Sequence, residues 1–254
     1  LSSKRLELGF GIAQIEDRYF QNNVIDFDKD KYDKSGYRLF GGSVSFNGST
    51  LNSRQFPIQG AREALVAQIF TGNESFRPGV NSENKKPVKE KHSWLQLSYM
   101  KEKYHKMGAN WILGWYLDAV YASKNFSENY TATMMQASEF APTAHSKLTY
   151  NEAFRANQYV AAGIRPIYRL NQMFHVRGEF YGFLPIFPIE RNSINKAYYG
   201  KAFSRFEYLG EISVVCQLPF GAISAYVNHY SSPRREWNVG LTLGWQLFNY
   251  RFIE

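Results

Sequence analysis

Serine and histidine side chains are the first candidates for chemistry, because a serine hydrolase needs a nucleophile with a base beside it. The nucleophile elbow of such enzymes follows the pattern G-x-S-x-G at a turn between a strand and a helix. The nearest string, Gly41-Gly42-Ser43-Val44-Ser45, lacks the second glycine and lies within an alternating, strand-like segment. His145 and Ser146 are adjacent in a predicted loop, which is the wrong arrangement for a catalytic dyad. We therefore predict that this chain has no catalytic residues.

Metal ligation is the second kind of chemistry that the residue types allow. None of the histidines shows the i, i+4 spacing of a helical zinc site or joins a cysteine cluster. Cys216 is the single cysteine, so neither an intrachain disulfide nor a cysteine-based metal site is possible. The sequence predicts no metal and no cofactor. The histidines are His92, His105, His145, His175 and His229.

A third group of side chains is ionic and shares one phase of the alternating segments. We predict that these residues lie on the inner face of a sheet formed by those segments, where they form a structural ion-pair network. An alternative is that Arg155, on a long loop, pairs with Glu179 and holds that loop inside as a plug. The predicted inward residues are Glu7, Asp118, Arg165, Arg169, Arg177, Glu179 and Glu211.

The elements that position these residues are predicted from a repeat of two. The clearest strand is 237–248, in which Trp237, Val239, Leu241, Leu243 and Trp245 share one face, and Asn, Gly, Thr and Gln fill the other. Strict alternation over about eleven positions exceeds the usual ~5–6-residue strand of a soluble sheet. It matches the ~9–11 residues with which a tilted strand crosses a membrane.

Similar alternation predicts about ten strands in all, joined by connections that alternate in length. Short connections are expected near 105–110, 170–172 and 219–221, and no helical period is apparent. Short turns at one end and long loops at the other are typical of outer-membrane barrels. Long loops are expected near 18–36, 73–91, 123–156 and 187–204.

We therefore predict one domain, 1–254, with an all-β fold: an antiparallel transmembrane β-barrel with roughly ten strands in this chain. Aromatic residues make up 17% of the sequence, and mean hydropathy is −0.43 because the two faces cancel. A membrane-spanning sheet must close, since an open edge leaves backbone groups without partners. No signal peptide is visible at Leu1, which suggests a mature or truncated chain. Trp111, Trp115, Trp237 and Trp245 are the expected members of the aromatic girdles.

The net charge of +8 limits the expected partners. Lysines cluster at 85–91 and 101–106, and we interpret them as solvated loops and turns, with attraction to anionic lipid headgroups as the alternative. No nucleic-acid-binding fold is recognisable, so we expect no nucleic-acid partner. The expected partner is outer-membrane lipid.

One segment resembles a turn of a known superfamily. Leu51-Asn52-Ser53-Arg54-Gln55-Phe56-Pro57-Ile58-Gln59-Gly60 is similar to the periplasmic turn "N-x-x-x-F-P-T-R-G". That turn is typical of the superfamily that contains the barrel assembly factor and the two-partner secretion transporters.

Other segments resemble the C-terminal β-barrel of Bacteroidetes patatin-like phospholipase outer-membrane proteins. They are residues 140–147, the string Phe154-Arg155-Ala156-Asn157 and residues 244–252. The resemblance implies a sixteen-stranded barrel, with about six strands and a patatin lipase domain ahead of Leu1. It also implies a long loop whose Arg-Gly motif docks on an acidic residue inside the barrel, with Ala156 here in place of the glycine.

The resemblance implies a role in the bacterial outer membrane. The barrel would anchor, and translocate or display, an N-terminal passenger, and any phospholipase activity would lie in that upstream domain. Two alternatives stay open: a self-contained pore or adhesin of about ten strands, and a soluble ligand-binding barrel. The soluble barrel would need an apolar interior and a polar exterior.

Overall fold

Ten strands form one antiparallel sheet in the computed structural model, which describes residues 3–20, 32–79, 82, 85–218, 221–232 and 237–245. Neighbours in the sheet are consecutive along the chain, except where the hairpin of β8 (Ile189–Arg191) and β9 (Ala197–Tyr199) separates β7 from β10. The predicted all-β antiparallel class is therefore confirmed. The sheet comprises β1 (Ser3–Tyr19), β2 (Asp33–Ser49), β3 (Gly60–Arg77), β4 (Val88–Lys106), β5 (Trp111–Ala122), β6 (Gln158–Arg169), β7 (Phe174–Pro185), β10 (Glu207–Leu218), β11 (Gly221–Tyr230) and β12 (Trp237–Trp245).

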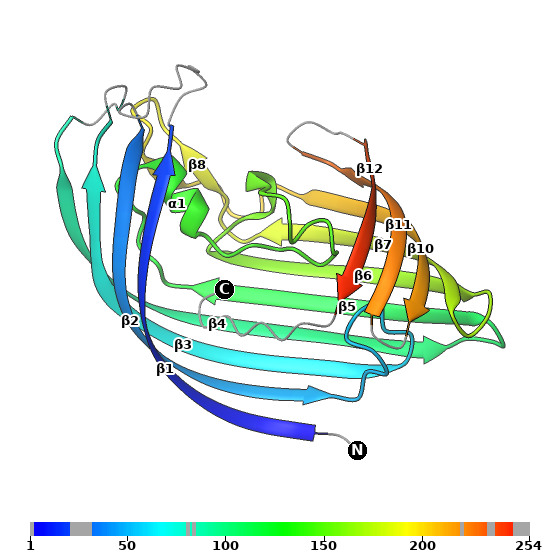
Figure 1. The fold of residues 1–254 in the computed structure, drawn as a ribbon. Helices are drawn as coiled ribbons and strands as arrows, with labels where there is room; N and C mark the ends of the chain where they lie inside the picture. Colours follow the sequence, from blue (N-terminus) through cyan, green and yellow to red (C-terminus); the bar gives the residue numbers. More distant parts are fainter. Residues whose placement is uncertain are drawn as a thin grey trace.

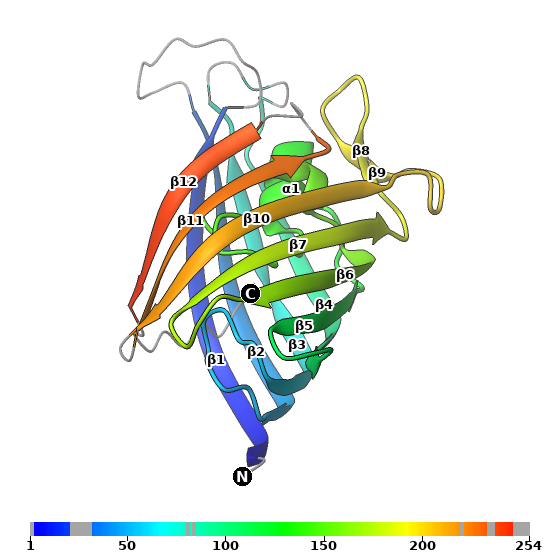
Figure 2. The ribbon, with the colours of Figure 1, turned by 90° about the vertical axis from the view of Figure 1, so that its right-hand side faces the viewer.

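The sheet is strongly curved, so it has a concave and a convex face (Figures 1 and 2). The short helix α1 (Tyr130–Gln136) lies on the concave side. Strands β1 and β12 are the two edges, and no pairing joins them within the described residues. No helix in the described part of the chain is long and apolar enough to span a membrane.

Large apolar side chains point outward from the convex face. Exposed fractions reach 80% for Phe10 and 84% for Ile12 on β1, and 83% for Val239 and 81% for Leu241 on β12. Trp237 is 71% exposed and Trp111 is 56% exposed, so both side chains point outward, while their place in a girdle stays a prediction. Trp115 has the same phase on β5 but is half-buried, and the side chain of Trp245 lies outside the described residues.

Several strands extend further than the sequence predicted. β1 ends at Tyr19 and β2 begins at Asp33, while β3 ends at Arg77 and β4 begins at Val88. Both ends of the predicted loops 18–36 and 73–91 are therefore strand. Lys89 and Lys91 of the first lysine cluster, and all three lysines of the cluster 101–106, accordingly belong to β4 and not to loops or turns. The loop 123–156 contains α1 and the 3-10 turn Glu152–Phe154, which no helical period indicated. The predicted residues 246–248 of the last strand fall outside the described residues.

The connections do alternate in length. The turns 50–59, 107–110 and 170–173 lie at one end of the sheet, here called the turn end. Residues 123–157 and 186–206 connect strands at the other end, here called the loop end. Figure 2 shows that the connections at the loop end are the longer ones.

The turn 50–59 has a local explanation in the sequence. The Asn52 side chain accepts hydrogen bonds from the backbone N–H groups of Ile58 and Gln59, both at 3.0 Å. Phe56 and Gly60 adopt positive φ angles of 48° and 94°. A Cβ atom at Gly60 would lie 2.1 Å from the Thr50 carbonyl oxygen, so only glycine fits where β3 begins.

Replacing Gly60 with Ala should therefore destabilise the protein. The left-handed backbone and the contact with Thr50 predict a loss of ~2 kcal/mol or more in the free energy of unfolding, measured by urea denaturation. Gly108→Ala is the matched control, because nothing lies within 4 Å of a Cβ atom there. Equal losses for the two variants would contradict this explanation.

Candidate functional site

Residues 123–157, here called the inner loop, lie against the concave face and contact the β1–β4 side of the sheet (Figure 1). The Gln136 amide donates to Asp17 on β1 at 2.8 Å, and the Asn129 amide donates to the Tyr19 hydroxyl at 2.7 Å. Tyr37 on β2 donates to Ser127 at 2.9 Å. These contacts join side chains that are up to 119 positions apart in the chain.

Lys124 adds a charged contact between the inner loop and β4. Its ammonium group lies 4.7 Å from the Trp94 ring centroid and donates to the Gln136 carbonyl oxygen at 3.0 Å. Burial in this position lowers the pKa of Lys124 to about 8, against the opposing attraction of Glu74 and Asp17. The buried ammonium group of Lys124 therefore holds the start of the inner loop against β4.

The end of the inner loop packs on the opposite side of the curved sheet. Phe140 and Phe154 are each 2% exposed, and both rings lie 5.7 Å from the ring of Phe183 on β7. Tyr159 on β6 and Tyr181 on β7 complete this aromatic cluster. Because it contacts both sides of the sheet, the inner loop fills the concave space at the loop end.

The predicted plug residues Phe154, Ala156 and Asn157 are buried beneath the sheet, with exposed fractions of 2%, 0% and 1%. The predicted partner of Arg155 is wrong. Arg155 pairs with Glu139 at 2.8 Å and donates to backbone carbonyls at the end of α1, all within the inner loop. The guanidinium therefore stabilises the loop internally, and Glu179 is occupied by other cations.

The buried ionic cluster is formed by Arg165, Arg177, Glu102 and Glu179 on the concave face. Arg165 pairs with Glu102 and lies 3.7 Å from a carboxylate oxygen of Glu179, which also pairs with Arg177. Arg177 is 1% exposed and Glu179 is 5% exposed. Two buried guanidinium groups thus face two carboxylates, which satisfies the requirement that buried charges be paired.

Tyrosine hydroxyls fill the remaining hydrogen-bonding positions of this cluster. Arg165 donates to Tyr181 at 2.6 Å, and Arg177 donates to Tyr104 at 2.9 Å. Glycines opposite these rings leave the necessary space. A Cβ atom at Gly163 would lie 2.2 Å from the Tyr181 ring, and one at Gly114 would lie 2.6 Å from the Tyr104 ring.

The turn 50–59 meets the ionic cluster from the turn end. Arg177 donates to the Pro57 carbonyl oxygen at 2.8 Å, and Leu51 and Ile58 pack against a buried group that includes Tyr104. Ser53 accepts a hydrogen bond from Gln217 on β10 at 3.3 Å. The turn therefore extends from β2 and β3 to β7 and β10, on the turn-end side of the ionic cluster.

The other predicted inward charges have mixed environments. Asp118 accepts from Tyr116 at 3.1 Å, and Glu211 accepts from Asn228 at 3.2 Å, both on the concave face. Glu7 has the concave phase but is half-buried on the edge strand β1, outside the ionic cluster. Arg169 lies at the turn end of β6, where its guanidinium group donates to the Ala109 carbonyl oxygen at 3.2 Å and forms no ion pair with a described carboxylate. The predicted ion-pair network is thus confirmed for Arg165, Arg177 and Glu179 and not for Arg169.

Alternation in the sequence did not single out Glu102 and Tyr104, although it places both on the face of Gln96 and Ser98 in β4. It also missed a contact at the loop end, where His92 lies 2.8 Å from Glu74. Ligand atoms of Glu74, Glu90 and His92 lie within 4.8 Å of one another, a spacing that could hold a metal ion. Histidine spacing alone could not reveal this group, because Glu74 comes from the neighbouring strand.

The serine and histidine candidates form no hydrolase site among the described residues. His145 contacts the Tyr230 hydroxyl at 2.8 Å through one ring nitrogen and Thr149 at 3.4 Å through the other. Ser146 forms a local turn with Thr143. Ser43 lies inside β2, where its backbone pairs with β1 and β3.

Comparisons with protein-family models, curated proteins and solved structures gave no match. The family resemblance of the sequence therefore stays an expectation, and the site must be interpreted from its own geometry. That geometry is a filled concave face: an ionic cluster with a turn on one side and the inner loop on the other.

Arg165→Met should be severely destabilising, because it leaves Glu102 unpaired and removes one cation from Glu179. We expect a loss of ~3–5 kcal/mol in the free energy of unfolding, measured in detergent micelles. Adding Glu102→Gln should recover part of this loss. Arg169→Met is the matched control on the same strand and phase, with an expected loss below ~1 kcal/mol. Similar losses for Arg165→Met and Arg169→Met would contradict the cluster's role.

Proposed function

We propose that this chain forms the wall of an outer-membrane β-barrel that anchors a passenger domain and whose interior is occupied by the inner loop. The main observation that supports this proposal is a band of uncharged side chains on the convex face, bounded at both ends by polar residues. A soluble sheet gains nothing from such a surface, whereas lipid requires it.

The strand register aligns this band across β1–β4. Four rows of cross-strand neighbours, beginning at Leu6, Leu8, Phe10 and Ile12, contain no charged residue on the convex face. From Leu6 to Ile12 the band extends ~20 Å along the strand, at ~3.4 Å per residue. Polar rows follow in both directions: Gln14–Arg38–Asn73–Lys91 at the loop end, and Lys4–Gly48–Glu63–Lys101 at the turn end.

Membrane embedding also requires that the edges of the sheet find partners. In lipid, unpaired N–H and C=O groups of β1 and β12 would each cost several kcal/mol. In an antiparallel order of ten strands, the first and last run in opposite directions, so they are able to pair directly or through an even number of further strands. Direct pairing corresponds to a self-contained barrel, and intervening strands correspond to the larger barrel that the resemblance implies.

An anchoring role is favoured over an open pore because the concave face is filled. The aromatic cluster, the inner loop and the ionic cluster occupy the space through which a solute would pass. The resemblance to patatin-like outer-membrane proteins supports a passenger joined to the wall. Transport of that passenger would require the inner loop to move. A soluble ligand-binding barrel is disfavoured, because the apolar side chains face outward and the ionic ones inward.

Leu8→Arg tests the lipid-facing band. An arginine near the bilayer midplane should reduce the stability of the membrane-embedded form by ~2–4 kcal/mol. The measurement is the folded fraction in lipid vesicles, read from heat-modifiable gel mobility. Gln14→Arg is the matched control, because it lies on the same strand and face but beyond the band. Equal folding of both variants, or a monodisperse wild-type protein in detergent-free buffer, would contradict the proposal.

Crosslinking distinguishes direct closure from closure through further strands. In a Cys216→Ser background, cysteines at convex positions of β1 are combined one at a time with cysteines at convex positions of β12 and oxidised in membranes. Direct closure predicts an intrachain disulfide for at least one combination. Leu8→Cys with Val44→Cys is the positive control, because these residues are register partners on β1 and β2. If only the control crosslinks, the self-contained barrel is excluded.

A further inference from the structure

Beyond the uncharged band at the loop end, the convex face of β1–β4 carries an array of cations. The register arranges them in three rows of cross-strand neighbours. The two outer rows are rich in cationic side chains, and the middle row has small residues, Gly36 and Ser75, at its centre. The rows are Gln14–Arg38–Asn73–Lys91, Glu16–Gly36–Ser75–Lys89 and Arg18–Lys34–Arg77.

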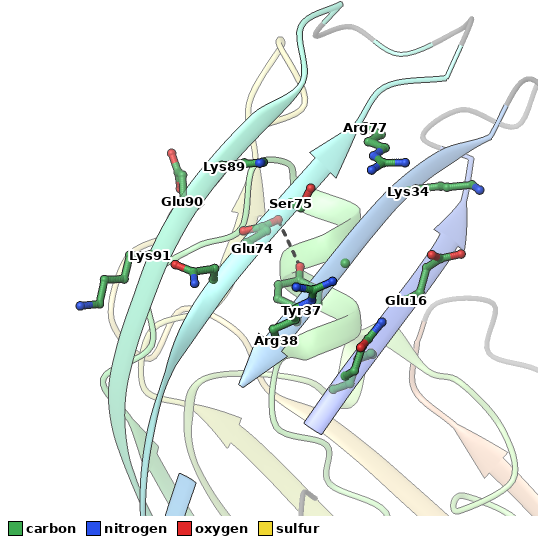
Figure 3. A pocket seen from close by; sticks show the side chains of 14 residues that line it. Glu16, Lys34, Tyr37, Arg38, Glu74, Ser75, Arg77, Lys89, Glu90 and Lys91 are labelled. Atoms are coloured by element: carbon green, nitrogen blue, oxygen red, sulfur yellow. Dashed lines mark hydrogen bonds between the residues drawn. The ribbon is translucent and has the colours of Figure 1, made fainter. Parts of the chain in front are cut away.

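The middle row leaves a hollow between the cationic rows. A Cβ atom at Gly36 would meet nothing closer than 3.8 Å, so the surface is open at that point. The hollow has a volume of about 700 Å³. Figure 3 shows Lys34, Arg38, Arg77 and Lys89 around it, from three neighbouring strands. We call this feature the cationic hollow. Its lining includes the cations Lys34, Arg38, Arg77, Lys89 and Lys91 and the carboxylates Glu16, Glu74 and Glu90.

The hollow has an excess of positive charge, because its cationic lining residues outnumber its carboxylates. Glu16 is bound to Arg18 at 2.7 Å, and Glu74 belongs to the concave phase, where it contacts His92. Among the described residues, no ion pair joins a carboxylate to Arg38, Arg77 or Lys89. Lys34 and Arg77 are direct register partners, an arrangement of like charges that is destabilising. The charge of Glu16 interacts with both, and Glu16 also pairs with Arg18.

The opposite margin of the same strands has fewer cations on the convex face. There, Glu63 pairs with Lys101 at 3.2 Å and accepts from Tyr99 at 2.6 Å, so a carboxylate lies among the cations. Both margins therefore contain a carboxylate among cations, and the loop end is distinguished by the larger number of cations in its rows.

We propose that the cationic hollow binds the phosphate groups of acidic lipid headgroups at the loop-end boundary of the membrane. This inference rests on the proposed membrane-embedded wall and adds a lipid-binding site to it. Arg38 lies two residues beyond Phe40 of the band, ~7 Å along the strand, which is the depth of the headgroup layer. Guanidinium groups bind phosphate oxygens in pairs, and lysine adds a point charge.

The test compares lipid retention by the full chain and its variants in detergent micelles. Native mass spectrometry measures binding of lipid A, a phosphorylated glycolipid, and of phosphatidylglycerol, against zwitterionic phosphatidylcholine. The wild-type protein should retain the two phosphate-bearing acidic lipids preferentially. The triple variant Arg38→Gln/Arg77→Gln/Lys89→Gln should bind them about 100-fold more weakly, since each basic residue near the membrane surface contributes to the attraction.

A matched variant removes the same charge elsewhere. Lys106→Gln/Arg169→Gln/Lys201→Gln lies outside the hollow and should bind the acidic lipids as the wild-type protein does. Heat-modifiable mobility verifies that each variant folds. Equal retention by the two triple variants, or no preference of the wild-type protein for acidic lipids, would overturn the site.

Two further outcomes separate the causes of failure. If inorganic phosphate alone displaces bound lipid at equal concentration, the hollow is a free-anion site and the lipid assignment is wrong. If the wild-type protein fails to fold into vesicles of any composition, the membrane-embedded wall itself is wrong. Folding into vesicles without a preference for acidic lipid removes only the lipid site.

Discussion

Burial of charge on the concave face constrains the phase of the strands that carry it. Arg165, Arg177, Glu102 and Glu179 come from β4, β6 and β7, and each needs its partners to offset the cost of leaving water. A slip of one residue in any of these strands would turn its charged side chain to the convex face and leave a partner unpaired. The same slip would bring apolar residues inward, so the two faces specify the register together.

The inner loop depends on that concave surface. Its contacts with β1–β4 are mostly polar, through Gln136, Asn129 and Lys124, whereas its contacts with β6 and β7 are mostly aromatic, through Phe140 and Phe154. An aromatic contact can slide at small cost, but directed hydrogen bonds and a desolvated amine select one position. The loop therefore connects both sides of the curved sheet and limits how far they can separate.

The convex face has the opposite chemistry, and its margins differ from each other. The uncharged rows need only an apolar environment, which lipid would supply in the proposed function. The rows beyond them carry charge: a pair at Glu63 and Lys101 at the turn end, and an excess of cations around Gly36 at the loop end. In this view the sheet combines a wall, a filled interior and a lipid-facing rim, each defined by position along the same strands.

Alternation in the sequence was sufficient to predict the antiparallel all-β class, the outward face of Trp237–Leu243 and the inward phase of Arg165, Arg177 and Glu179. A period of two is a local property, so it is readable without knowing which strands are neighbours. Pairing is not local. That Arg165 contacts Glu102, that Arg155 binds Glu139 and not Glu179, and that Lys34 faces Arg77 all follow from strand order, register and the path of the inner loop. Only the tertiary structure brings those residues together, because the distance between them along the chain carries no information about their distance in space.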